Sequence, residues 1–298
     1  MYQGAMVQPV FVTSLSLGGK GEQIAVPPAS PPASRGLFSG RMKGPPMADF
    51  DRTYAGLRGA TDRSVAYDMG LRTHMIRVYN YMAGGVAVTG VVAWLTYQMA
   101  VVTDAGGRII GLTPFGQTLF GSPLKWLIIL APLGFVLLFS FWIGQLQAST
   151  ARALFFAFAG IFGLSLATIF MVYTATSITR VFFISAAAFG ALSLYGYTTQ
   201  RSLDAVGSFL AMGLFGIVIA SLVNLFLASS ALQWTISIIG VVVFAGLTAW
   251  DTQKIKEMYS VTDDGTVAGR KAIMGALSLY LDFINLFTSL LQLMGDRR

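Results

Sequence analysis

The sequence predicts an all-α integral membrane protein, built as a bundle of seven transmembrane helices. Hydrophobic residues make up 55% of the 298 residues and charged residues only 11%, against roughly 25% charged in a typical soluble domain. The apolar residues gather in runs of about 20, which is the length of helix that crosses a bilayer. A chain with this balance has too little polar surface to cover a soluble globule.

Seven apolar runs predict the membrane-spanning helices. In chain order they cover Val78–Val102, Leu124–Gly144, Ala153–Tyr173, Val181–Tyr197, Val206–Leu227, Ala231–Trp250 and Ala272–Met294. Two runs, the second and the sixth, carry tryptophan near both ends: Trp126 and Trp142, and Trp234 and Trp250. A separation of sixteen residues corresponds to about 24 Å of helix, which is typical of aromatic belts at the two membrane interfaces.

The first 46 residues differ in composition from the rest. They hold seven of the ten prolines, with serine and glycine between them, a composition typical of a disordered tail. We therefore predict three regions: a disordered Pro/Ser/Gly-rich extension over 1–46, a cytoplasmic amphipathic lead-in over 47–77 and a seven-helix transmembrane domain over 78–298.

The distribution of lysine and arginine predicts the orientation of the chain. With seven spans, fifteen of these residues lie on the side of the N-terminus and five on the opposite side. Because positive residues concentrate on the cytoplasmic side, we expect the N-terminus in the cytoplasm and the C-terminus outside. In a bacterium this membrane is the cytoplasmic (inner) membrane.

Several classes of site and partner are excluded by composition. The chain has no cysteine, which excludes disulfides, thiolate metal sites and cysteine nucleophiles, and its single histidine, His74, leaves no plausible zinc cluster. The net charge of +7 comes from lysine and arginine residues that lie outside the apolar runs, as the orientation of a membrane protein requires. We therefore predict no nucleic-acid partner. We also expect no tightly bound cofactor and no enzymatic activity.

Two of the thirteen acidic residues stand apart from the others, which lie before the first span, in loops or at the end. Asp282 lies near the middle of the last apolar run, where a carboxylate costs several kcal/mol unless it is paired, protonated or hydrated. Asp251 borders the sixth run. Because no Gly or Pro occurs from Thr252 to Tyr259, that helix can continue to about Tyr259, which places both carboxylates at a similar depth.

Other polar residues are candidate partners of these acids. Asn285 is three residues beyond Asp282 and shares its helical face, and Tyr280 carries a hydroxyl nearby. Asn224 in the fifth span and Arg152 at the start of the third are further possible partners. An alternative for Asp251, a helix-end carboxylate in contact with headgroups and water, stays open.

The C-terminal third carries a family resemblance. The stretch from Phe244 to Tyr259, FAGLTAWDTQKIKEMY, followed by ALSLYLDFINLF from Ala276 to Phe287, resembles the C-terminal signature of the Bax inhibitor-1 family in its bacterial branch. The runs FAGIFGLSL, from Phe158, and LSLYGYTT, from Leu192, are similar to the third and fourth spans of that family. The resemblance covers roughly Asp49 to Gly295.

This resemblance implies a bundle whose last helix is central and wrapped by the other six. The paired aspartates of the family form a pH-responsive calcium-leak gate and correspond to Asp251 and Asp282. An arginine near the start of the family's third span, able to pair with the carboxylates, corresponds to Arg152. The second span here has no acidic residue, so a calcium-entry carboxylate proposed there has no counterpart.

The chemistry of two adjacent buried carboxylates fits that expectation. Both cannot ionise cheaply in a low-dielectric site, so they share a proton, and a divalent cation competes with that proton. Calcium prefers six to eight oxygen ligands, and Asp251 and Asp282 supply only part of that number. Incomplete coordination suits a leak better than a storage site.

The leading hypothesis is thus a pH-sensitive calcium leak channel or transporter, whose partners are the lipid bilayer and calcium ions. The alternative is a non-conducting membrane adaptor that regulates membrane-protein quality control, for example through an FtsH-type membrane-bound protease. An intramembrane hydrolase is the weakest reading, because the sequence offers no Ser/His constellation.

Overall fold

The computed structural model describes residues 47–105 and 108–298, and the predicted extension over 1–46 lies outside them. The residues Leu71–Arg298 form one compact unit that holds the helical bundle, whereas the described residues before Leu71 belong to a second unit. The predicted lead-in over 47–77 is helical and continuous with the first span, since α1 runs from Met47 to Ala100.

Six more long helices follow α1 in the described part of the chain. They are α3 (Leu124–Trp142), α4 (Ala148–Val172), α5 (Ala175–Thr198), α6 (Asp204–Leu227), α7 (Ser230–Glu257) and α8 (Gly265–Met294). Among the described residues, six helices are long and apolar enough to cross a membrane, namely the stretch Tyr67–Ala100 of α1 and the whole of α4 to α8. The helix α3, with 19 residues and an internal Pro132, is outside that set, so a count of seven stays a prediction.

A small hairpin and two short helical turns separate α1 from α3. Strand β1 (Val101–Thr103) pairs antiparallel with β2 (Ile109–Leu112), and α2 (Pro114–Gly116) and the π-helical turn η1 (Gln117–Gly121) follow. The predicted first span, Val78–Val102, therefore extends past the end of the helix into β1. The helix ends at Ala100 because Thr113 bonds the last carbonyls: its hydroxyl donates to Met99 over 2.7 Å and its N–H to Ala100 over 3.0 Å.

Most helices begin before the apolar run that predicted them, and α5, α7 and α8 are each capped by a polar side chain outside these runs. Asp264 caps α8, its carboxylate accepting from the N–H groups of Thr266 and Val267 at 2.8 and 2.7 Å. Thr174 and Ser229 cap α5 and α7 in the same way. A side-chain oxygen that satisfies the free N–H groups of the first turn stabilises a helix start independently of hydropathy.

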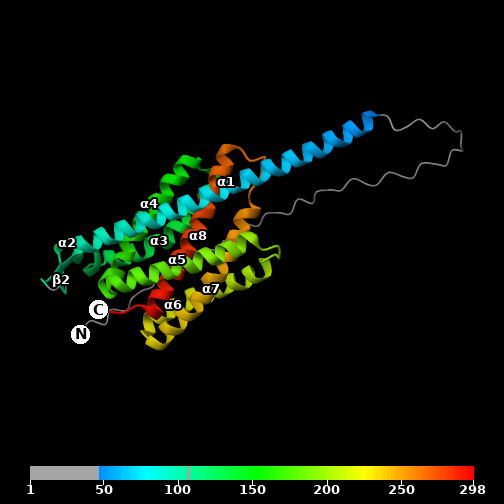
Figure 1. Ribbon diagram of the computed structural model, residues 1–298. Coiled ribbons are helices and arrows are strands. Elements are labelled where there is room, and N and C mark those ends of the chain that lie inside the picture. The colour runs from blue at the N-terminus through cyan, green and yellow to red at the C-terminus, as the bar shows by residue number, and fades with distance from the viewer. Residues whose placement is uncertain (1–46, 106–107) are drawn as a thin grey trace, which may run out of the picture. The chain divides into compact units, whose positions relative to one another are not determined.

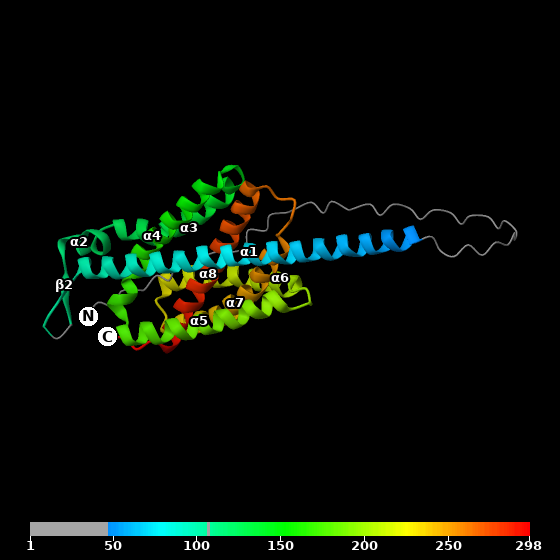
Figure 2. The ribbon, with the colours of Figure 1, turned by 45° about the horizontal axis from the view of Figure 1, so that its top comes forward.

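The C-terminal helix α8 is the central element of the bundle. Of its most apolar stretch, 83% is buried within the protein, whereas the corresponding values for the other five candidate spans lie between 22% and 44%. It packs against α4, α5 and α7, and it lies among them in both ribbon views (Figures 1 and 2). The principal neighbour of α3 is α4, and that of α6 is α7.

The last residues of the chain return to the connection between α4 and α5. The N–H of Thr174 donates to the carbonyl of Asp296 over 3.1 Å, and the N–H of Arg298 donates to the carbonyl of Val172 over 2.9 Å. Arg180 forms an ion pair with Asp296 at 3.1 Å. These contacts fix the end of α8 beside the start of α5.

Candidate functional site

The structure brings Asp251 and Asp282 together at the interface of α7 and α8. These two helices pack against each other more extensively than any other two elements of the described chain. Asp251 is 5% exposed and Asp282 is fully buried, and their carboxyl groups are close enough to interact directly. The pairing expected from their similar depth is therefore present.

Small residues on both helices allow this close approach. A Cβ atom added to Gly240 of α7 would lie 2.7 Å from the hydroxyl of Ser289, and one added to Gly275 of α8 would lie 3.0 Å from the side chain of Ile255. Such positions let helix backbones come together in a membrane. In the antiparallel pair α7 and α8, the two contacts lie on either side of the acids.

Asp282 is the least satisfied polar side chain in this interface. Neither of its carboxyl oxygens has a hydrogen bond of normal geometry to any described residue, although the carboxyl of Asp251 is close to it. Asn285 donates its amide to the carbonyl of Leu281 in its own helix over 2.8 Å. The hydroxyl of Tyr280 bonds Thr89 at 2.7 Å. Since buried polar groups are usually paired, Asp282 is an exception that calls for a function.

The other predicted partners lie away from the acids. Arg152 is exposed at the start of α4, and it takes part in neither ion pair found among the described residues, which are Arg180–Asp296 and Lys271–Asp263. Asn224 bonds Gln233 and the N–H of Ser229 at 3.0 Å. The cation that acts on Asp251 is Lys254, whose ammonium group lies 4.8 Å from the centre of the Trp250 ring.

A chain of hydroxyl groups next to Asp251 was not predicted. The hydroxyl of Tyr79 in α1 lies 2.5 Å from that of Ser193 in α5, which lies 2.9 Å from that of Thr252 in α7. Beside it, Gly196 contacts the backbone of Ala249 with no room for a side chain. The sequence signal for this chain was the presence of serine and threonine within apolar runs. Only the packing of the helices shows that their hydroxyl groups meet.

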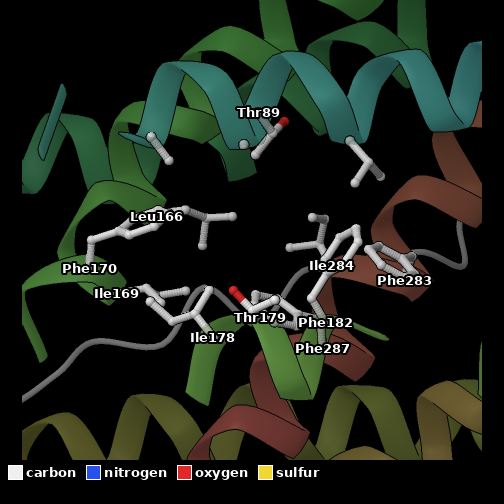
Figure 3. Close-up of a pocket in the computed structure, with 13 residues that line it drawn as sticks. Thr89, Leu166, Ile169, Phe170, Ile178, Thr179, Phe182, Phe283, Ile284 and Phe287 are labelled. Carbon is white, nitrogen blue, oxygen red and sulfur yellow. The ribbon is translucent and has the colours of Figure 1, made fainter. Parts of the chain in front are cut away.

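A cavity of about 250 Å³ lies on the opposite side of α8, between α1, α4, α5 and α8. Phe283, Ile284 and Phe287 line it from α8, and Ile178 and Phe182 line it from α5 (Figure 3). Its two lining threonines use their hydroxyls elsewhere: Thr89 donates to the carbonyl of Ala159 and Thr179 to that of Ala175. The cavity is apolar and separate from the acid pair.

The acid pair also limits how a cation is held. Within the described ranges, no group of three or more His, Cys, Asp or Glu side chains is arranged to hold a metal ion. A calcium ion at Asp251 and Asp282 would take the rest of its six to eight oxygen ligands from carbonyls and water.

These features define an all-α integral membrane protein with a carboxyl pair buried beside its central helix. The family model described as inhibitor of apoptosis-promoting Bax1 matches residues 71–298. The chain therefore belongs to the Bax inhibitor-1 family, as its C-terminal motifs predicted.

Curated bacterial proteins are similar over nearly their whole length. RP147 of Rickettsia prowazekii is 46% identical over 252 residues, which are 85% of this chain and 100% of that protein. The inner membrane protein YbhL of Escherichia coli K12 is 44% identical over 240 residues, 80% of this chain and 97% of YbhL. YrjE of Lactococcus lactis is 36% identical over 242 residues, 78% of this chain and 96% of that protein.

Proposed function

We propose that this protein is a pH-sensitive calcium leak channel of the bacterial inner membrane, gated by Asp251 and Asp282. One observation carries the proposal: two interacting carboxyl groups are buried where α7 meets the central helix, and the oxygens of Asp282 lack a normal hydrogen bond within the described chain. The similarity to the inner membrane protein YbhL supports the location.

The gating mechanism follows from the repulsion between the two carboxylates. When both are ionised at short distance in a low-dielectric site, the repulsion is large, so one shared proton stabilises the closed arrangement. A calcium ion can replace that proton because it also neutralises the pair. Proton and calcium therefore compete for one site, which makes the leak depend on pH. This assigns the pair to gating, with no catalytic step.

The decisive measurement is calcium flux into liposomes that hold the purified full-length protein, across a series of pH values. Asp251→Asn and Asp282→Asn keep the size of the side chain but remove the shared proton, so each should flatten the pH profile of the flux. Glu257→Gln is the matched control, because Glu257 is exposed at the end of the same helix as Asp251. If both Asn variants keep the wild-type flux and profile, the gating model is wrong.

The same assay separates the channel from the adaptor hypothesis. A non-conducting adaptor that regulates a membrane-bound protease requires no ion pathway, so the wild-type protein would show no calcium flux at any pH. In that case the acid pair would contribute to the stability of the fold. The Asn variants would then change the free energy of unfolding and not the calcium flux.

We further propose seven spans, with α3 crossing the membrane, the N-terminus in the cytoplasm and the C-terminus outside. The support is the fifteen-to-five distribution of lysine and arginine. A reporter fused after Arg298 should read as external and one fused before Asp49 as cytoplasmic. If α3 does not cross, six spans remain and both reporters will give the same side.

A further inference from the structure

A polar stripe runs along α8 from the acid pair to the end of the helix. It consists of Asp282, Asn285, Ser289 and Gln292, whose separations of three, four and three residues place them on one helical face. The first three are buried and Gln292 is half-buried. In a membrane helix a stripe of this kind faces protein or water, not lipid.

The outer end of this stripe meets polar side chains of α6 and α7. The amide oxygen of Gln292 accepts from the amide of Gln233 over 2.5 Å and from the hydroxyl of Ser237 over 2.6 Å. Asn224 of α6 in turn donates to Gln233 over 3.0 Å. We call these four residues the amide cluster. Because Gln233 and Gln292 are half-buried, the cluster adjoins the membrane face at which α8 ends.

Phe244 lies on the same face of α7 as Ser237 of the amide cluster and Asp251 of the acid pair, and between them along the helix. Gly240 faces Ser289, and the Phe244 ring comes within 3.9 Å of a Cβ atom built on Gly240. Phe244 is four residues after Gly240 on α7, and Asn285 is four residues before Ser289 on α8. Because the two helices are antiparallel, Phe244 lies level with Asn285. The ring is 1% exposed, so a buried apolar group lies on α7 between the levels of the two polar halves.

Simple adhesion between helices does not account for the whole of the inner half of the stripe. Polar side chains that join membrane helices do so by bonding across the interface, as the amide cluster does. Asn285, however, bonds the carbonyl of Leu281 in its own helix, and Asp282 has no normal hydrogen bond to a described residue. Asn285 therefore adds a polar group to the interface without joining α8 to α7.

We propose that the polar stripe of α8 is the route between the acid pair and the membrane face at which α8 ends. The amide cluster is its entrance, and Phe244 is the apolar barrier that closes it. That calcium is the ion on this route rests on the proposed function. The route itself makes a separate claim, that water enters the α7–α8 interface along Gln292 and Ser289.

The cysteine-free sequence allows a direct test of water access. Single variants Ser289→Cys and Asn285→Cys of the full-length protein, in liposomes, are treated with a charged, water-soluble methanethiosulfonate. Two matched controls are Ser185→Cys, a buried serine on α5 away from the stripe, and Val242→Cys, which is 64% exposed on the outer surface of α7. Because only a hydrated thiolate reacts, Ser289→Cys should react about tenfold faster than either control, and Asn285→Cys at the control rate.

Replacing the barrier sharpens the test. Adding Phe244→Ser should raise the modification rate of Asn285→Cys to that of Ser289→Cys, and should raise the resting calcium flux. Phe244→Leu, which keeps an apolar but smaller side chain, should raise both by less and serves if the serine variant does not fold. Phe158→Ala removes an equally buried ring on α4 and should leave both rates unchanged. Gln292→Leu should lower the flux.

The outcomes distinguish the route from the channel. A Ser289→Cys variant that reacts no faster than the two controls overturns the route, even if calcium flux is normal. Fast modification without calcium flux at any pH supports the route and overturns the calcium function. If neither Phe244 variant alters the rate at Asn285→Cys, the proposed barrier is wrong.

Discussion

The two faces of α8 show opposite ways of burying polar groups. Toward α1 and α4, Tyr280 is enclosed by the rings of Phe155, Phe158 and Phe162, whose centres lie 5.8 to 5.9 Å from its own. Its hydroxyl bonds Thr89, which also bonds the carbonyl of Ala159. Toward α7, Asp282 is equally buried but lacks a normal hydrogen bond to any described group. One face is satisfied and the other is not.

This difference indicates that the two faces of α8 have different roles. Edge-to-face aromatic pairs each contribute about 0.5–1.5 kcal/mol beyond their area burial, so the Tyr280 face stabilises the position of α8. The Asp282 face leaves an ionisable group in need of a partner, which stability alone does not favour. Proteins break such packing rules mainly at functional sites. Substitutions on the two faces should therefore affect different properties.

The largest effect on stability is expected from Phe158→Ala. The side chain is fully buried, so its removal should lower the free energy of unfolding by about 3 kcal/mol through lost packing, measured by denaturant unfolding in detergent micelles. The pH profile of calcium flux in the folded fraction should not change. Phe183→Ala, at a ring that is 66% exposed, is the control and should cost far less. A changed pH profile in Phe158→Ala would link the aromatic face to gating.

A smaller effect is expected from Tyr280→Phe. This change removes one hydroxyl and keeps the ring, so it should lower the free energy of unfolding by about 1 kcal/mol, while Thr89 retains its bond to Ala159. Tyr195→Phe, at an exposed tyrosine of α5, should be neutral in the same unfolding measurement. Equal stability of both variants would contradict the view that the Tyr280 hydroxyl helps to hold α8.

The smallest effect is expected from Arg152→Ala, which touches neither face. Its side chain is exposed, so the unfolding free energy should change by less than about 0.5 kcal/mol and the resting flux should stay the same. The family resemblance implies instead that an arginine here restrains the acid pair. An altered resting flux would show that the protein adopts a second arrangement in which Arg152 reaches Asp282; Arg180→Ala, in an exposed ion pair, is the control.

Much of the helical framework was predictable because hydropathy is a local property of the chain. The apolar runs located α4 to α8, and the absence of helix breakers after Trp250 predicted the continuation of α7, which ends at Glu257. Asp282 was identifiable because a single charge stands out within an apolar run. The hairpin after Ala100 was missed, since it depends on the pairing of Val101 with Leu112 and on bonds from Thr113.

Local sequence by itself determined the membrane class, most of the helices and the two acidic residues of the site. Tertiary structure alone decided which side chains meet them: it brought Asp251 against Asp282, turned the Tyr280 hydroxyl toward Thr89 and left Arg152 exposed. The physical reason is that hydropathy sums over neighbours along the chain, whereas a side chain's partners depend on helix register. In this protein, close contacts at Gly240 and Gly275 set that register.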